Sequence, residues 1–161
     1  MRTDINIYEA TEATPELANA IAALLPQLST TPHPFGLDDL KAIASSKDSH
    51  LFILAVNGQT AGMITLAFYT TPTGRKAWAE DLVVDSSWRG HSFGKLLINH
   101  VIQFAEDNGP CQLMLTSRPS RIAANALYRS IGFAAKETNV YKMSLKECTC
   151  ILFITITNDC F

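Results

Sequence analysis

The sequence lacks a long apolar segment and an excess of charge of either sign. No run approaches the roughly 20 apolar residues of a membrane span, and the first residues, MRTDINIYEATEA, are polar and acidic where a signal peptide is apolar. Thirteen basic and fifteen acidic residues leave a net charge of -2, so no overall field favours nucleic acid or an anionic membrane. We therefore expect a cytoplasmic protein with neither of these partners.

Cysteine is scarce and poorly spaced for cross-linking or for binding metal. Of the four cysteines, Cys111 stands alone, whereas Cys148, Cys150 and Cys160 fall near the end of the chain. The pair Cys148-Thr-Cys150 lacks the two-residue gap and the distant second pair that zinc sites usually show. We expect reduced thiols, no disulfide framework and no metal site.

A serine nucleophile is suggested by one motif and then fails for want of partners. Residues Gly90 to Gly94 read GHSFG, the Gly-x-Ser-x-Gly pattern on which many hydrolases mount a catalytic serine. These enzymes need an acid and then a histidine later in the chain, but only His100 follows Ser92 and no Asp or Glu lies between them. On one helix His100 would also lie about 12 Å along the axis from Ser92.

Two nucleotide-binding loops are absent as well. The Walker pattern needs a Lys-Ser/Thr pair after its last glycine, whereas Gly94 is followed by Lys95-Leu96. The dinucleotide fingerprint G-x-G-x-x-G does not occur in the chain. The glycines of this loop therefore need another explanation.

What the chain does contain is enough apolar sequence for one globular domain, 47% of 161 residues, with two kinds of periodicity. Helical spacing and turn residues predict helices, and short β-branched or apolar runs predict strands. Pro26 is expected to end the first helix, and Asn57-Gly58 predicts a tight hairpin. The expected elements are strand 7–10, helix 15–25, helix 37–46, strands 51–56, 59–69 and 76–85, helix 92–107, strand 111–117, helix 121–132 and extended segment 133–145.

This order predicts an α+β fold with one mixed sheet. A meander of antiparallel strands precedes a β-helix-β-helix-β run, and the latter requires a parallel crossover. We assign residues 1–147 to a single domain. The apolar extension 148–161 is either an additional strand or a dimer element, and the sequence does not decide between them.

The loop D-S-S-W-R-G-H-S-F-G is a candidate anion site between a strand and a helix. The first turn of a helix offers up to four free N–H groups and about half a positive charge, and glycine lets the backbone approach a phosphate. Arg89 could add a side-chain fork. The alternative is a capped helix with Ser92 as N-cap and glycines in a tight turn.

Two motifs give the chain from Ile5 to Leu145 a resemblance to the GCN5-related N-acetyltransferase (GNAT) family, which uses acetyl-coenzyme A. LVVDSSWRGHSFGKLL resembles the family's strand followed by Arg/Gln-x-x-Gly-x-Gly/Ala, with Ser92 where the first motif glycine is usual. NALYRSIGF resembles Ala-x-x-Leu-Tyr-x-x-x-Gly-Phe when Ala124 is the alanine, and Arg121 replaces a common asparagine. The resemblance implies a mixed sheet of about six to seven strands with about four helices.

The resemblance also implies which residues bind the coenzyme. Backbone amides around the glycine loop would hold its diphosphate, and the strand before the loop would pair with pantetheine and bind the thioester carbonyl. Asn125 is a weaker candidate for coenzyme contact. The implied coenzyme-binding residues are Leu82, Val83, Val84, Arg89, Gly90, His91, Ser92, Phe93, Gly94, Lys95, Asn125 and Tyr128.

For the chemistry, the resemblance implies direct attack of an amine on the acetyl thioester. Glu80 is the candidate base and Asp81 its rival, because strand alternation would turn only one of them into the cleft; a water relay or a purely structural acidic pair are alternatives. Tyr128 matches the family's tyrosine near the sulfur, and its alternative is an ordinary core tyrosine.

The acceptor is expected to be the primary amine of a small molecule. Selectivity is expected in loops 29–36 and 70–76, which contain His33, Phe35 and Arg75. Two other functions stay open: an acyl-coenzyme A-binding regulatory module without turnover, and a protein or peptide N-acetyltransferase. Dimers are common in the family, which makes a homodimer an option.

Overall fold

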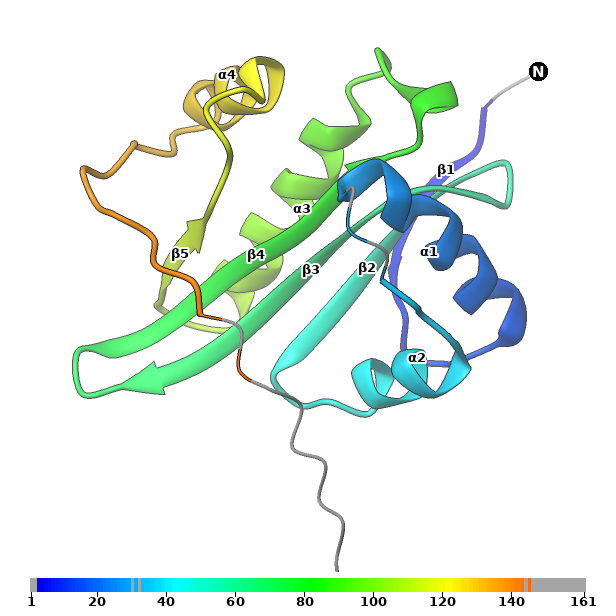
Figure 1. The fold of residues 1–161 in the computed structure, drawn as a ribbon, viewed down its shortest axis with the longest axis horizontal. Helices are drawn as coiled ribbons and strands as arrows, with labels where there is room; N and C mark the ends of the chain where they lie inside the picture. The colour runs from blue at the N-terminus through cyan, green and yellow to red at the C-terminus, as the bar shows by residue number, and fades with distance from the viewer. Residues whose placement is uncertain (1–2, 30, 32, 144, 146–161) are drawn as a thin grey trace, which may run out of the picture.

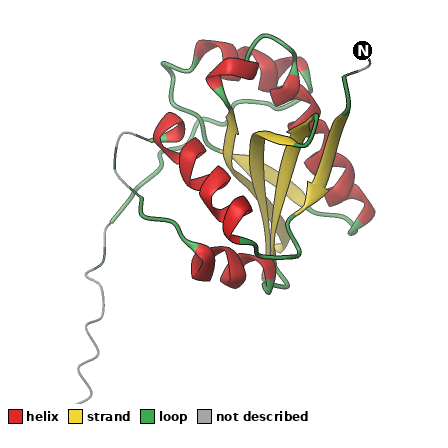
Figure 2. Ribbon diagram, turned by 90° about the vertical axis from the view of Figure 1, so that its right-hand side faces the viewer, coloured by secondary structure: helices red, strands yellow, loops and turns green. Residues whose placement is uncertain are grey.

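The computed structural model describes residues 3–29, 31, 33–143 and 145 and consists of one sheet between helical layers. Five strands pair in the order β1-β2-β3-β4-β5, with α1 and α2 on one face and α3 on the other (Figure 1). Figure 2 shows the sheet from the side with helices on both faces. The elements are β1 Ile5–Glu9, α1 Pro15–Leu28, α2 Leu37–Ala44, β2 Ser49–Val56, β3 Gln59–Thr71, β4 Gly74–Val84, α3 Phe93–Asp107, β5 Gln112–Leu115 and α4 Ile122–Ser130.

The sheet is antiparallel from β1 to β4 and parallel between β4 and β5, as the order of elements predicts. Asn57 and Gly58 have φ angles of 50° and 79°, the left-handed conformations of a two-residue hairpin turn, and the predicted hairpin is confirmed. The chain then crosses from β4 to β5 through α3. The expected mixed α+β sheet is therefore correct.

Two apolar clusters, one on each face of the sheet, hold the helices in place. On one face Leu97 and Val101 of α3 are fully buried against β2, β3 and β4. On the other face Ile21 of α1 and Leu40 of α2 are buried against Ile53. Burying each such side chain contributes about 1.5–3 kcal/mol, so these clusters fix the helices that surround the site.

Two sequence expectations on the elements are wrong. Pro26 does not end the first helix, because α1 continues to Leu28, and the Ser29 N–H still reaches the Leu25 carbonyl at 3.1 Å. A proline this close to a helix end removes only one hydrogen bond, and the packing of α1 on the sheet outweighs that loss.

The expected strand after α4 is also missing, because the described residues 133–143 and 145 contain no strand. Val140, Tyr141 and Met143 are 74%, 88% and 82% exposed, so no burial drives this segment into the sheet. The described part of the chain thus has five strands and four α-helices where the resemblance implied six or seven strands. The apolar extension 148–161 lies outside the described residues.

The structure also bears on the cysteines, on metal ligands and on membrane-spanning helices. Cys111 is a free thiol, and the remaining cysteines lie outside the described residues. Among the residues that are described, no three His, Cys, Asp or Glu side chains gather as metal ligands. Within the same residues, no helix has the length and apolarity needed to cross a membrane.

The backbone at Ser92 is strained. Ser92 lies at the N-cap of α3 as predicted, but its φ of 63° and ψ of 17° are left-handed and its side chain makes no capping hydrogen bond. The Ser92 hydroxyl therefore does not stabilise the first turn of α3. A left-handed residue with a Cβ costs about 1–2 kcal/mol relative to its usual conformations, whereas glycine adopts this region freely.

We predict that Ser92→Gly is more stable than Ser92→Ala by about 1 kcal/mol in denaturant unfolding, because glycine relieves the left-handed strain and alanine retains it. The alanine variant is the matched control, since both variants lose the hydroxyl and only one loses the Cβ. If Ser92→Ala were the more stable of the two, the left-handed conformation at position 92 would be wrong.

Candidate active site

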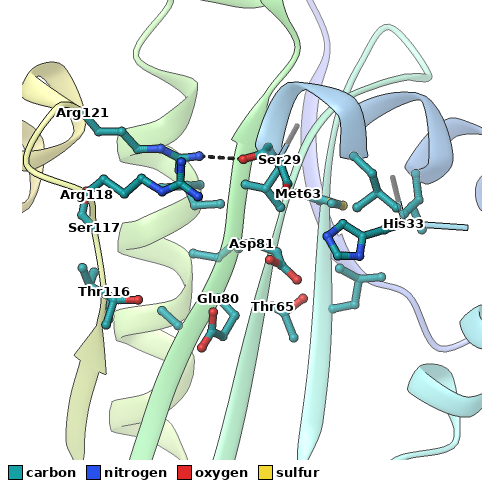
Figure 3. Close-up of a pocket in the computed structure, with 18 of the residues that line it drawn as sticks. Ser29, His33, Met63, Thr65, Glu80, Asp81, Thr116, Ser117, Arg118 and Arg121 are labelled. Carbon is teal, nitrogen blue, oxygen red and sulfur yellow. Dashed lines mark hydrogen bonds between the residues drawn. The ribbon is translucent and has the colours of Figure 1, made fainter. Parts of the chain in front are cut away.

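A cavity of about 880 Å³ lies where β4 and β5 separate (Figure 3). Its floor is formed by β3 and β4, and its walls come from α1, the loop before α2, the end of β5 and α4. Polar and charged side chains on these walls come from segments far apart in the sequence. They are Ser29, His33, Thr65, Glu80, Asp81, Thr116, Ser117, Arg118, Arg121, Tyr128 and Lys142.

A bulge in β4 brings both candidate carboxylates into this cavity. The β3–β4 register shifts between Met63 and Thr65, and Asp81 has a left-handed φ of 54°. Glu80 and Asp81 both line the cavity, and Figure 3 shows both carboxylates directed into it. The expectation that alternation turns only one of them inward is wrong, because a bulge interrupts the two-residue period of the strand.

The environment of Glu80 favours its protonated form. Partial burial raises the pKa of its carboxyl above the usual value, and the negative charge of Asp81 raises it further. Trp78, two residues earlier on β4, offsets part of this rise, although its buried Nε1 makes no hydrogen bond of normal geometry. A carboxylate whose pKa is raised in a cleft has the property expected of a proton acceptor near neutral pH.

Tyr128 lines the same cavity from α4. Its ring is half-buried and packs edge-to-face on Phe133 with ring centroids 6.0 Å apart. Burial raises the pKa of its phenol, and the nearby charge of Arg121 lowers it in part. The hydroxyl therefore stays protonated at neutral pH and is available as a hydrogen-bond donor. Glu80 and Tyr128, which are 48 residues apart in the chain, are thus on the walls of one cavity.

The two central strands separate beside these residues. Parallel pairing of β4 with β5 ends at Ala79 and Leu115, whereas β4 continues to Val84. The Asp85 N–H donates to Ala61 of the β3 side at 2.8 Å, so by alternation Val83 also faces β3. Leu82 and Val84 then turn their N–H groups toward the open side. Of the three predicted strand residues, these two present free donors where β5 has left the sheet.

The loop before α3 presents another set of backbone donors. Within the described residues, no acceptor receives a hydrogen bond from the N–H groups of residues 90–94; the first bonded amides of the turn are those of Lys95 and Leu96, both to the Ser92 carbonyl. Gly90 has a φ of 85°, and no atom lies within 4 Å of where a Cβ would project. This open, glycine-lined turn fits a phosphate group at a helix N-terminus.

The Arg89 side chain has partners elsewhere. Its Nε donates to the Val84 carbonyl at 3.2 Å and one terminal nitrogen donates to Gln27 Oε1 at 3.3 Å. The Arg89 guanidinium, which was expected to bind an anion, is therefore turned toward protein groups. In this arrangement Arg89 secures the loop to the end of β4. His91 likewise turns its Nδ1 back to the carbonyls of Trp88 and Arg89.

Gln27 is a structural residue of the site that sequence reasoning missed. Besides Arg89, it contacts Asp85 at 2.7 Å through Nε2 and accepts from the Ser86 N–H at 2.9 Å. It thereby ties the end of α1 to the loop before α3. Hydrogen bonds from the Ser87 side chain and then from Gln27 lower the pKa of Asp85. A lone glutamine next to Pro26 carries no signal in sequence that would reveal this role.

Of Asn125 and the two expected selectivity loops, only the loop 29–36 lines the cavity. Asn125 is absent from the cavity wall and donates through Nδ2 to the Arg118 carbonyl at 2.9 Å, so it holds the segment before α4. His33 and Phe35 line the cavity, as expected for the loop 29–36.

Loop 70–76 does not line the cavity, and its predicted role in selectivity is not supported by its position. Arg75 lies over the Phe68 ring at 4.2 Å and bonds the Asn108 carbonyl, while Lys76 bonds Gln112. These basic residues hold the far end of the sheet. Arg118 and Lys142, which sequence reasoning did not single out, contribute the positive charge at the cavity, together with Arg121.

Comparison with known proteins matches this architecture. A profile of the Acetyltransferase (GNAT) family matches residues 18–133. The chain is 31% identical over 98 residues to N-acetyltransferase 8 of Homo sapiens and 32% identical over 98 residues to N-acetyltransferase 8B of Rattus norvegicus. Each alignment covers 60% of this chain but only 43% and 44% of the relative, so the chain spans less than half of their length.

Solved structures share the fold at low sequence identity. An aminoglycoside acetyltransferase, meta-AAC0020 from an uncultured soil metagenomic sample, in complex with trehalose, has a TM-score of 0.74 at 19% identity, covering 89% of this chain and 97% of that chain. Aminoglycoside N-acetyltransferase AAC(6')-Iy in complex with CoA has a TM-score of 0.68 at 20% identity, covering 91% and 96%. Ribosomal-protein-alanine N-acetyltransferase from Brucella melitensis biovar Abortus 2308 has a TM-score of 0.68 at 20% identity, covering 90% and 100%.

The profile match over most of the chain agrees with the separated central strands and the open loop before α3, and this chain belongs to the GNAT family of acetyltransferases.

Proposed function

We propose that the protein is an N-acetyltransferase that transfers the acetyl group of acetyl-CoA to the primary amine of a small molecule by direct attack. The observation that carries this proposal is the joint position of Glu80, Asp81 and Tyr128 on one cavity, beside the end of β4–β5 pairing. The cavity volume of about 880 Å³ suits a small molecule. The names of the aminoglycoside acetyltransferases with this fold agree with a small-molecule amine.

The loop of residues 89–95 is proposed to bind the diphosphate of the coenzyme. The free N–H groups of residues 90–94 support this assignment, because a diphosphate would satisfy donors that the described protein leaves without partners. Arg89 acts here through the loop that it secures to β4 and not through direct contact. The coenzyme, when bound, supplies an acetyl thioester.

The N–H groups of Leu82 and Val84 are proposed to face the pantetheine and the thioester carbonyl. An N–H group that is fixed by the strand and freed from pairing by the separation of β5 stabilises negative charge on that oxygen without having to reorganise. Backbone pairing would also give pantetheine the place of an added strand. The N–H of Val83 faces β3 and is not available to the coenzyme. Val83 contributes to the site only through its buried side chain, which packs in the core.

Glu80 is proposed to accept the proton of the attacking amine, directly or through a water. An amine with a pKa near 10 is neutral in only about one molecule in a thousand at pH 7, which costs roughly 4 kcal/mol. The raised pKa of Glu80 makes it a better acceptor than an exposed carboxylate. The ammonium first gives one proton to Glu80, directly or through a water. As the C–N bond then forms and the C–S bond breaks, the electron pair passes to sulfur and the second proton of the nitrogen leaves to solvent.

Tyr128 is proposed to donate a hydrogen bond to the leaving sulfur. A phenol is a weaker acid than a thiol by about 1.5 pKa units, so full proton transfer before C–S cleavage is uphill. Burial raises the pKa of Tyr128 and increases that difference. Stabilising the developing thiolate by a hydrogen bond is therefore its more favourable role.

We expect Tyr128→Phe to lower kcat about 100-fold, because the variant keeps the ring and loses the hydroxyl proposed to stabilise the leaving thiolate. The measurement is release of free thiol from acetyl-CoA with a panel of amines. Acetyl-CoA affinity by calorimetry should change little and serves as the control for folding and binding. Equal turnover of the variant and the wild type would remove Tyr128 from the mechanism.

We expect Glu80→Gln to lower kcat/KM at neutral pH about 100-fold, with a loss that shrinks as rising pH supplies neutral amine without a base. Asp81→Asn is the matched control, because asparagine tolerates the left-handed backbone at this position. A strong loss in Asp81→Asn beside a nearly normal Glu80→Gln would transfer the role of base to Asp81.

The raised pKa of Glu80 also predicts a pH effect on stability. Folding favours protonated Glu80, so this contribution is fully present below the ordinary pKa of 4.5 and is lost as pH rises through the higher folded value. Glu80→Gln should therefore gain stability relative to the wild type as pH rises across that window. Chemical unfolding of both proteins between pH 4 and pH 7 measures the difference, and a constant difference would contradict the raised pKa.

Acetyl-CoA binding with an amine panel separates the proposed activity from its alternatives. Binding together with amine-dependent thiol release supports a small-molecule enzyme. Tight binding without release by any amine or peptide indicates a regulatory module, and release with peptides alone indicates a protein N-acetyltransferase. Absence of acetyl-CoA binding would contradict the proposed role of the loop 89–95.

A further inference from the structure

The cavity carries charges of opposite sign on different walls. Glu80 and Asp81 stand on the β4 floor, whereas Arg118 and Arg121 enter from the segment that leads into α4. Figure 3 shows both guanidinium groups reaching toward the end of α1, on the side of the cavity away from the Glu80 carboxylate. Lys142 lines the cavity as well. A ligand that fills this space meets carboxylates at one part of its surface and cations at another.

Much of this positive charge is free for a ligand. The side chain of Arg118 makes no hydrogen bond or ion pair with any described residue. Arg121 uses one terminal nitrogen, which donates to the Leu28 carbonyl at 2.8 Å across the cavity. A guanidinium has five N–H donors, so this contact orients Arg121 and leaves further donors. Neither arginine is neutralised by Glu80 or Asp81, since no ion pair links them.

This cationic wall adjoins the proposed diphosphate loop but uses different residues: Arg121 donates to the Leu28 carbonyl, and the neighbouring Gln27 contacts Arg89 of the loop. Residues 89–94 do not line the cavity, and their contribution to an anion comes from backbone amides at the start of α3. The arginines instead present guanidinium groups and belong to the segment between β5 and α4. A second anionic group, distinct from the coenzyme diphosphate, would therefore find partners here.

Apart from Ser29, His33, Thr65, Thr116, Ser117 and Tyr128, the rest of the cavity wall is apolar. Ile21, Leu25 and Leu28 of α1, Phe35 and Ile43 around α2, and Leu51 and Met63 of the sheet face it. Such a surface stabilises an apolar ligand body by about 25 cal/mol for each Å² removed from water. This apolar part of the wall offers no hydrogen-bond partners, so it suits an apolar group of the acceptor better than a hydroxyl or ammonium group.

We propose that the acceptor is an amine that also carries an anionic group, such as an amino acid with an apolar side chain. The proposal rests on the proposed function and specifies its substrate class. Glu80 and Asp81 receive the amine, the fork of Arg118 binds the carboxylate, and the apolar wall holds the side chain. A phosphonate presents the same chemistry to arginine and is separated from carboxylate by the experiment below.

Matched pairs of amines test this class directly. Phenylalanine and phenethylamine, tryptophan and tryptamine, and leucine and isopentylamine differ only in the carboxylate, and 1-amino-2-phenylethylphosphonate supplies the phosphonate. We expect the wild type to prefer the anionic member in kcat/KM by thiol release. Arg118→Met should lower kcat/KM for the anionic members about 10- to 100-fold and leave their uncharged partners within about twofold. Arg118→Lys should recover part of the loss.

Arg129→Met is the matched control, because Arg129 lies on α4 but does not line the cavity. It should leave the preference unchanged. Equal wild-type turnover of both members of each pair would overturn the proposal. The proposal would also be overturned if Arg118→Met lowered kcat/KM for all amines equally and lost its affinity for acetyl-CoA, because Arg118 would then bind the coenzyme.

Failure of the proposed function is distinguishable from failure of this inference. If no amine releases thiol, calorimetry of the same pairs with the CoA-bound protein still measures the preference for the anionic member. A preference that Arg118→Met removes supports the proposed ligand class even without turnover. Equal or absent binding of both members contradicts it.

Discussion

The separation of β4 from β5 is the constraint on which the site depends. Pairing ends at Ala79, and two residues later the bulge at Asp81 turns the strand and shifts its register with β3. The separation frees the N–H groups on one edge of β4, and the bulge places two carboxylates beside them. A regular strand would keep the donors paired to β5 and turn one carboxylate to the opposite face.

The loop before α3 and the cavity are held together by α1. Its last turn lines the cavity, and Gln27 in that turn contacts the loop through Asp85, Ser86 and Arg89. The packing of Ile21 and Leu24 fixes the helix on the sheet. Displacement of α1 would therefore disturb the cavity wall and the loop before α3 at once, which links apolar packing at a distance to the geometry of both.

Sequence identified the elements whose signals are local and missed those set by tertiary structure. The Asn57-Gly58 hairpin and the start of α3 depend on turn chemistry that is visible in a few residues. The consecutive acidic residues Glu80 and Asp81 are compatible with a kink in the strand, but no glycine marks the bulge and the sequence does not show that both carboxylates enter one cavity. Arg118 enters the site through the path of the segment before α4, a path that spacing alone does not specify.

The charges of the cavity bear on how an ammonium group could lose its proton. Asp81 raises the proton affinity of Glu80, and the two carboxylates together attract a cationic amine but also stabilise it as a cation. Arg118 and Arg121 act in the opposite direction, since positive charge nearby lowers the pKa of an ammonium. An acceptor whose own anionic group neutralises the arginines would lose part of that help. Proton transfer then depends also on how closely Glu80 approaches the amine, a distance set by the bulge that positions Glu80.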